Sequence, residues 1–245
     1  MSAGGGITLS QADSITFDEL TATEVSLTSG GDITIIGTAT IDGSSSFEST
    51  SDGTISLTDS NNTFGTLTLT GGVIEVVEAG DVELSEVNAS TSFTLTAGGN
   101  VTDVLGSSLT SAVTTIDATG DLTLGDVDSD DVRFDTIDIV AQNIILGERD
   151  SVLIENLSGQ SLELTAIGDI EQTATSAVDI VDAVTLDAGT GNILLENTGN
   201  SFGSIEVLSA ADVSLLDSTD TPILGIDALT RLRWSPVDRS PMTRM

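Results

Sequence analysis

The feature that most constrains this chain is an internal repeat of about 70 residues, because self-similarity at a fixed period is the sequence signature of repeat architectures. Three pairs of segments carry the repeat: NTFGTLTLTGGVIEVVEAGDVEL (62–84) with VRFDTIDIVAQNIILGERDSVLI (132–154), SFTLTAGGNVTD (92–103) with SLELTAIGDIEQ (161–172), and residues 46–65 with residues 184–203. The offset of the third pair is twice that of the second. Phe64 matches Phe134 and Ile74 matches Ile144, whereas most of the polar residues between them change. Conserved apolar spacing with variable polar residues indicates one structural unit written three times.

Within each copy a shorter pattern recurs, in which Gly with Asp or Asn, or a close variant, precedes an alternating apolar stretch. It stands at GGDITII, SDGTISL, AGDVELS, AGGNVTD, TGDLTLG, AQNIILG, IGDIEQT, TGNILLE and AADVSLL. Short alternating stretches bounded by Gly, Asp and Asn are typical of β-strands joined by tight turns. Many of these marks are about 19–26 residues apart, so we interpret a 69-residue unit as three coils of roughly 23 residues.

Coils of this length built from short strands favour a parallel β-helix. A single coil cannot bury its own apolar side, but stacking places each inward Val, Ile or Leu about 4.7–4.9 Å above its counterpart. Outward positions are then free to vary among Thr, Ser, Glu and Asp. A β-sandwich also has short alternating strands, but it does not predict a 69-residue unit carried across three copies. The sequence therefore predicts an all-β parallel β-helix, or solenoid, of about ten coils over residues 1–228.

The charge of the chain excludes several classes of partner. There are 39 acidic residues, six Arg, no Lys and no His, which gives a net charge of −33. Such a field repels phosphate backbones and anionic lipid surfaces, so we expect no nucleic-acid partner. No apolar run approaches the ~20 residues of a membrane span, so we expect no membrane insertion. The absence of Cys excludes disulfides and thiol chemistry.

Several short motifs resemble those of a known family. NTFG, NSFG, LTLTGG, LTAGGNVTD and DATGDLTLGDV are similar to the repeats of large bacterial filamentous-haemagglutinin-like adhesins. The resemblance covers about residues 5–228, and it implies a right-handed parallel β-helix on a secreted or cell-surface protein. The family's NPNL-type secretion motif is not present, and the start, MSAGGGITLSQ, is not a secretory signal. We therefore expect an internal or truncated rod segment whose export needs a segment outside this sequence.

The composition changes beyond Ile226. The segment DALTRLRWSPVDRSPMTRM contains four of the six Arg, two of the three Pro and the only Trp. We expect residues 229–245 to form a weakly ordered tail or a cap on the last coil.

The candidate metal site is the acidic stretch GDVDSDD, whose carboxylates belong to Asp126, Asp128, Asp130 and Asp131. Ca²⁺ takes several carboxylate and carbonyl oxygens, so this stretch is where Ca²⁺ would bind, although its spacing is not that of an EF-hand loop. No other cofactor is expected.

The side chains of this chain argue against most β-helix enzyme chemistry. β-Helix lyases and hydrolases act on polysaccharides with Lys, Arg or His, but this chain has neither His nor Lys. Only Arg133 and Arg149 lie within the repeats, and Arg149 is expected to pair with Glu148 or Asp150. Paired carboxylates could still hydrolyse a glycoside if the pKa of one were raised. The preferred hypothesis is nevertheless not an enzyme.

The sequence thus favours a non-catalytic structural rod or display segment of an exported bacterial surface adhesin or filamentous protein. The alternatives are a β-helix enzyme acting on polysaccharide and a Ca²⁺-dependent carbohydrate-binding module. The expected location is extracellular or at the cell surface. The expected partners are a surface glycan, a host or neighbour-cell receptor, or an end-to-end continuation of the parent rod. Phe64, Phe134 and Phe202, which each begin a copy, are expected to fill a corner of the core.

Overall fold

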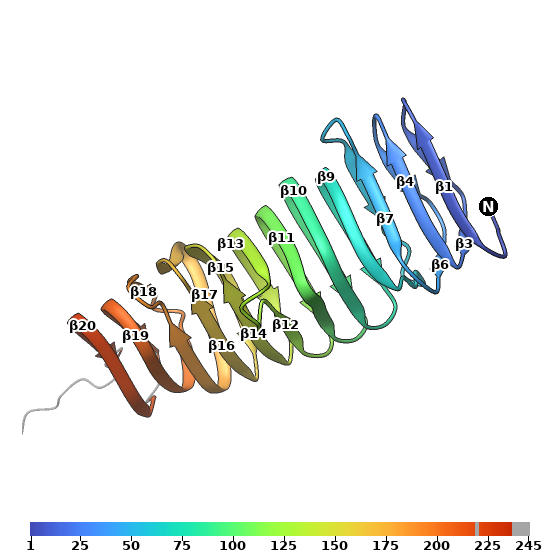
Figure 1. The fold of residues 1–245 in the computed structure, drawn as a ribbon. Coiled ribbons are helices and arrows are strands. Elements are labelled where there is room, and N and C mark those ends of the chain that lie inside the picture. The colour runs from blue at the N-terminus through green and yellow to red at the C-terminus, as the bar shows by residue number, and fades with distance from the viewer. Residues whose placement is uncertain (219–220, 237–245) are drawn as a thin grey trace, which may run out of the picture.

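The computed structural model describes residues 1–218 and 221–236 as one elongated stack of coils (Figure 1). Within these ranges every regular element is a strand, so no helix there could cross a membrane. The strands are β1 (Gly6–Gln11), β2 (Ile15–Phe17), β3 (Leu20–Ala22), β4 (Glu24–Ser29), β5 (Ile33–Ile35), β6 (Ala39–Ile41), β7 (Ser45–Ser49), β8 (Thr54–Leu57), β9 (Thr66–Glu78), β10 (Val82–Ala97), β11 (Val101–Ala118), β12 (Leu122–Leu124), β13 (Asp131–Val140), β14 (Asn143–Glu148), β15 (Val152–Gly159), β16 (Ser161–Ala166), β17 (Ile170–Asp187), β18 (Ile193–Leu195), β19 (Ser201–Asp217) and β20 (Ile223–Pro236).

Each coil contributes strand to three faces of the rod. Face 1 begins with β1, β4 and β7, face 2 with β2, β5 and β8, and face 3 with β3 and β6. All strand pairings on these faces are parallel. Longer strands such as β9, β10 and β11 bend around a corner, which is why hydrogen bonding joins most strands into one 18-stranded sheet. The predicted all-β parallel solenoid is confirmed.

The core is an aliphatic column enclosed by the three faces. Ile15, Ile33, Ile55 and Ile74 pair one above the other along face 2, and each is at most 3% exposed. Alternate residues point outward, as Glu75 does beside Ile74. Burial of apolar area, worth roughly 25 cal/mol per Å², is therefore repeated in every coil.

The three Phe residues that begin the sequence copies lie in the core, as predicted. Phe64 is 8% exposed, Phe134 1% and Phe202 2%. Phe64 also packs edge-to-face on Phe47, with ring centroids 5.9 Å apart and an interplanar angle of 79°, a favourable geometry for aromatic pairs.

The coils vary in length, and most are shorter than the sequence marks suggested. The separation of stacked partners gives the period of each coil. No coil period is shorter than the separation of Ile137 and Ile154, and none is longer than that of Ile170 and Ile193, among the paired strands. The chain makes about 11 turns, close to the predicted ten. The prediction that each sequence unit makes three coils of roughly 23 residues is nevertheless wrong, because the unit continues beyond its third coil onto the next face.

The punctuation of Gly with Asp or Asn forms polar ladders along the corners of the rod. In each ladder a side-chain oxygen accepts a hydrogen bond from the backbone N–H of the equivalent residue one coil later. The acceptor distances lie between 2.7 and 3.3 Å, in the ladders Ser14–Asp32–Thr54, Asp81–Asn100–Asp121–Asn143 and Ser151–Asp169–Asn192–Asp212. Each rung satisfies a turn N–H that the strand ladders leave unpaired.

The three ladders occupy three different corners. The first precedes face 2, the second precedes face 3, and the third precedes face 1. We number the units by the residue at which each ladder starts: unit 1 from Ser14, unit 2 from Asp81 and unit 3 from Ser151. Each unit thus spans three coils and one further face, and the next unit starts one-third of a turn further around the rod.

The last strand crosses the boundary that the composition suggested at residue 229. β20 pairs with β19, and Leu232 lies opposite Val213. Arg233 lies 3.4 Å from the carboxylate of Glu196. The chain up to Pro236 therefore continues the solenoid, and residues 237–245 of the expected tail or cap lie outside the described residues.

Candidate functional site

An acidic loop at the corner between β12 and β13 distinguishes unit 2 from its neighbours. The chain from Leu124 to Phe134 is longer there than the equivalent stretch from Leu195 to Phe202 in unit 3. Gly125 begins the loop with a φ of 67°, a left-handed conformation that favours glycine. The additional length makes a loop that projects from the rod.

Two of the four predicted metal ligands come together with a third residue that the sequence reasoning missed. One carboxylate oxygen from each of Asp103, Asp126 and Asp130 lies within 4.8 Å of the other two. Asp103 belongs to the preceding coil, one coil period before Asp126, so that period was the signal that could have identified it. The oxygens bound to one Ca²⁺ lie about 2.3–2.6 Å from the ion, so a spacing of this size fits a shared cation.

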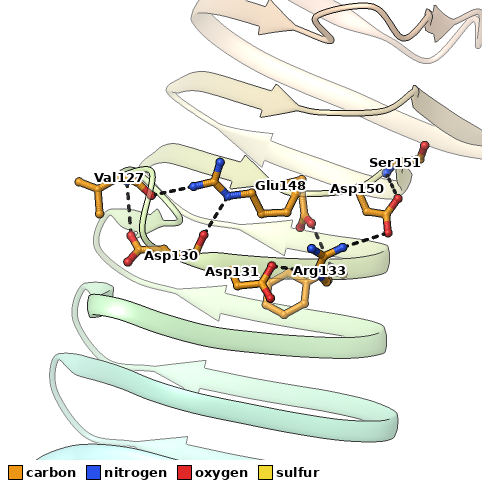
Figure 2. Close-up of polar contacts among 9 residues, drawn as sticks. Val127, Asp130, Asp131, Arg133, Glu148, Asp150 and Ser151 are labelled. Atoms are coloured by element: carbon orange, nitrogen blue, oxygen red, sulfur yellow. Dashed lines mark hydrogen bonds and ion pairs between the residues drawn. The ribbon is translucent and has the colours of Figure 1, made fainter.

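The other two predicted ligands point elsewhere. Asp128 is exposed, and its carboxylate lies 4.0 Å from the guanidinium of Arg149. Asp131 pairs with Arg133 at 2.8 Å, and Arg133 also reaches Asp150 at 3.4 Å (Figure 2). The structure therefore does not bring these two carboxylates into the group around Asp103.

Arg149 holds the acidic loop from the following coil. Its Nε donates to the backbone oxygen of Asp130 at 2.9 Å, and a terminal nitrogen donates to the backbone oxygen of Val127 at 3.2 Å. The expected pairing with Glu148 or Asp150 is wrong, because the side chain reaches back along the axis to the preceding coil.

Burial, neighbouring charge and hydrogen bonds act on the carboxylates at the loop. Burial raises the pKa of Asp103, and the nearby Asp130 carboxylate adds to this rise. Hydrogen bonds from the Ser107 hydroxyl at 2.5 Å and from the Gly125 N–H at 3.1 Å oppose the rise. Asp130 is 3% exposed and accepts the Gly106 N–H at 2.7 Å. Asp103 and Asp130 are therefore held in place by the protein, while Asp126 is exposed.

The same corner of unit 3 carries amides where unit 2 carries carboxylates. Gln172 and Asn197 are the equivalents of Asp103 and Asp126. Asn200, whose equivalent in unit 2 is Val132, lies beside them, whereas Asp130 belongs to the additional length of the unit 2 loop. Gln172 donates to the Asn200 side-chain oxygen at 3.0 Å and accepts from the Asn200 side-chain nitrogen at 2.9 Å. Gln172 also accepts the backbone N–H of Asn197 at 3.0 Å.

The difference between amides and carboxylates changes which hydrogen-bond donors and charges the corner requires. An amide both donates and accepts, so the amides of unit 3 satisfy one another, whereas an ionised carboxylate only accepts. Three carboxylates at this spacing repel, and a hard divalent cation would replace the missing donors. The chemistry of Asp103, Asp126 and Asp130 fits Ca²⁺.

A shallow hollow of about 380 Å³ lies beside the loop on face 3. Its lining combines acidic residues with the outward aliphatic side chains of Ile145 and Ile167. None of the residues that line it is aromatic, so it offers no ring for a sugar to stack upon.

A second polar feature, two buried glutamates, was not predicted. Glu148 is 1% exposed and its Oε2 accepts the Phe134 N–H at 3.1 Å. Glu78 is 4% exposed and its Oε2 accepts the Phe64 N–H at 2.9 Å. Burial raises the pKa of Glu148 to about 8 and that of Glu78 to about 7. The spacing from Phe to Glu is the same in both units, and this was the signal that could have identified the pair.

Parallel strands stacked in about 11 turns, with a sequence unit written three times, define a β-solenoid repeat protein. The chain matches the family described as repeats of unknown function (DUF5649) over three consecutive segments, residues 4–71, 70–133 and 141–209. It belongs to that family. Comparison with curated proteins gives no match, and comparison with solved structures gives none either.

Proposed function

We propose that this solenoid is a non-catalytic structural rod, or display segment, of an exported bacterial surface protein of the adhesin or filamentous kind. The observation that carries the proposal is the unbroken axial stack of coils from β1 to β20 (Figure 1). A stack of this kind holds its two ends apart at a fixed distance, which is what a spacer requires. The short motifs that resemble filamentous-haemagglutinin-like repeats support an extracellular or cell-surface location.

The distribution of ionisable groups supports a non-catalytic role. A general acid needs a raised pKa and access to substrate. The two glutamates with the highest pKa values, Glu78 and Glu148, are buried in the core against the Phe64 and Phe134 backbone. The outward charge, which contributes to the net −33, keeps such rods soluble and apart from one another.

Three measurements test this proposal: small-angle scattering, antibody labelling and an assay for polysaccharide cleavage. Small-angle scattering of the purified chain should give a rod about 53 Å long, from about 11 turns at ~4.8 Å each. An antibody against the rod should label intact source cells without permeabilisation. Labelling that required lysis would overturn the surface assignment, and release of new reducing ends from a polysaccharide panel would overturn the non-catalytic one.

The carboxylates of Asp103, Asp126 and Asp130 favour a second candidate, a Ca²⁺-dependent carbohydrate-binding module. The surface glycan would occupy the hollow beside the loop, and Ca²⁺ would bridge the loop carboxylates to sugar hydroxyls. Binding to a glycan array in Ca²⁺, with loss of binding in a chelator, is the expected result. Binding that is unchanged by the chelator, or by an Asp126→Asn variant, would exclude this candidate.

A further inference from the structure

The carboxyl of Glu148 closes a corner of the core, and its two oxygens are not equally hydrogen-bonded there. Its Oε2 accepts the Phe134 N–H, but its Oε1 is buried without a hydrogen-bond partner among the described residues. A neutral carboxyl tolerates this position at a modest cost, whereas a carboxylate there would be an unpaired charge in an apolar core. The corner is therefore built for the protonated form.

Unit 1 repeats this arrangement at the same distance along the chain. Glu78 accepts the Phe64 N–H at 2.9 Å, and the Gly80 N–H also reaches its carboxyl. In unit 3 the equivalent residue is Asp217, which is fully buried and accepts a hydrogen bond from the Thr221 hydroxyl. The corner behind the Phe residue thus carries a buried acid in all three units.

The charged groups that face Glu148 do not neutralise it. From β13, Arg133 favours the carboxylate, while Asp135 on the same strand and Asp150 on the following turn disfavour it. β16 places the uncharged Ala166 opposite Glu148. Arg133 is already paired with Asp131 and Asp150.

Glu78 lies in a less charged setting. β10 places Ala97 opposite it, and the groups that act on its carboxyl are the backbone N–H groups of Phe64 and Gly80. Desolvation is therefore the main force on both glutamates.

We propose that Glu148 and Glu78 are proton-operated latches: the protonated side chains close the corners of units 2 and 1 over Phe134 and Phe64, and ionisation opens those corners locally. The corners at the unit boundaries of the rod are therefore closed at mildly acidic pH and open at alkaline pH.

The direction follows from proton linkage. In the open corner Glu148 is solvated, with its ordinary pKa of 4.5, and in the closed corner its pKa is about 8. The closed form therefore binds more protons between these values, so the opening constant rises about tenfold per pH unit across that window. For Glu78 the window ends at about 7, so the corner of unit 2 should remain pH-sensitive after that of unit 1 has levelled off.

Amide hydrogen exchange tests the latch in the full chain. The ratio of the Phe134 exchange rate to that of Phe93, a fully buried strand residue, cancels base catalysis. This ratio should rise steadily from pH 5 to pH 8 in the wild type and stay level in the Glu148→Gln variant, which keeps an oxygen for the Phe134 N–H. The exposed Glu155→Gln variant is the matched control and should behave as wild type. A level wild-type ratio, or an undiminished rise in Glu148→Gln, would overturn the proposal.

Direct titration keeps the proposal testable if Glu148→Gln does not fold. The side-chain carboxyl carbons of the wild type, followed by nuclear magnetic resonance, should titrate near pH 8 for Glu148 and near pH 7 for Glu78. Midpoints near the ordinary 4.5 for both residues would show that neither corner holds a proton, and the latch would be refuted.

Discussion

Ile74 and Ile144 occupy the same place in consecutive sequence units but lie on different faces of the rod. Ile74 stacks between Ile55 and Phe93 on face 2, whereas Ile144 stacks between Leu122 and Leu162 on face 3. Axial neighbours are therefore not sequence equivalents. The core accepts this mixing because the stacking partners of both residues, Ile55, Phe93, Leu122 and Leu162, are large apolar side chains.

The assigned inward positions make the first prediction. Replacing Ile144 with Asp places an uncompensated charge in a site that is 1% exposed, and should lower the free energy of unfolding by about 3–5 kcal/mol. Replacing the exposed Glu75 with Lys should change it by less than about 0.5 kcal/mol. Urea unfolding followed by circular dichroism measures both, and equal effects would contradict the register.

The corner ladder makes the second prediction. Asp121→Ala removes the oxygen that accepts the Asn143 N–H, so stability should fall by about 1 kcal/mol, as for a lost turn cap. Asp121→Asn keeps an acceptor and should cost less. Asp117→Ala, at an exposed strand position in the same coil region, serves as the control for loss of a surface carboxylate. If both Ala variants unfold at the same urea concentration, the ladder does not stabilise the corner.

The two arginines within the repeats should differ in importance. Arg149→Ala removes charge-assisted hydrogen bonds to the Asp130 and Val127 backbone, and should cost about 1.5–3 kcal/mol. Arg133→Ala breaks only exposed ion pairs, with side chains about half exposed, and should cost less than about 1 kcal/mol. Thermal unfolding of the two variants at matched salt tests the order, and a reversed order would show that the loop does not depend on Arg149.

Calcium makes the fourth prediction. Millimolar Ca²⁺ should raise the melting temperature more than Mg²⁺ at matched ionic strength, because Ca²⁺ accepts a flexible many-oxygen site. Screening of the net charge of −33 is common to both ions and cancels in this comparison. Asp103→Asn should abolish the difference, whereas Asp128→Asn, whose carboxylate lies at Arg149, should retain it. Identical melting temperatures in the two ions would mean that the loop is merely solvated.

The repeat predicted the fold because the apolar positions that recur in each copy are the positions buried in the core. Ile74, Ile144 and Phe134 are inward for the reason that the sequence displays, namely that stacking keeps one side of every coil apolar. The offset between units was not predictable, because the length of a coil varies with the shape of each of its corners. Punctuation marks identify corners but do not say which corner of the rod each one occupies.

The candidate site was predicted in part for a related reason. Asp126 and Asp130 are close in sequence, so their clustering could be read directly, whereas Asp103 reaches them only through the register of adjacent coils. Arg149 was assigned to its sequence neighbours, although its long side chain spans to the coil before. Contacts along the axis of a solenoid are separated by a whole coil in sequence, and local patterns do not record them.

Because each unit adds a fractional turn, the number of units determines both the length of the rod and the rotation of its distal end about the rod axis. In a longer array, gene duplication of one unit would lengthen the rod by about 16 Å, from ten strand segments shared among three sides at ~4.8 Å per coil. The same duplication would rotate all coils beyond it by about 120° about the rod axis, and a gain of three units would restore their original orientation. Recombination between repeats could thus change the direction that a distal surface faces without changing any side chain on that surface.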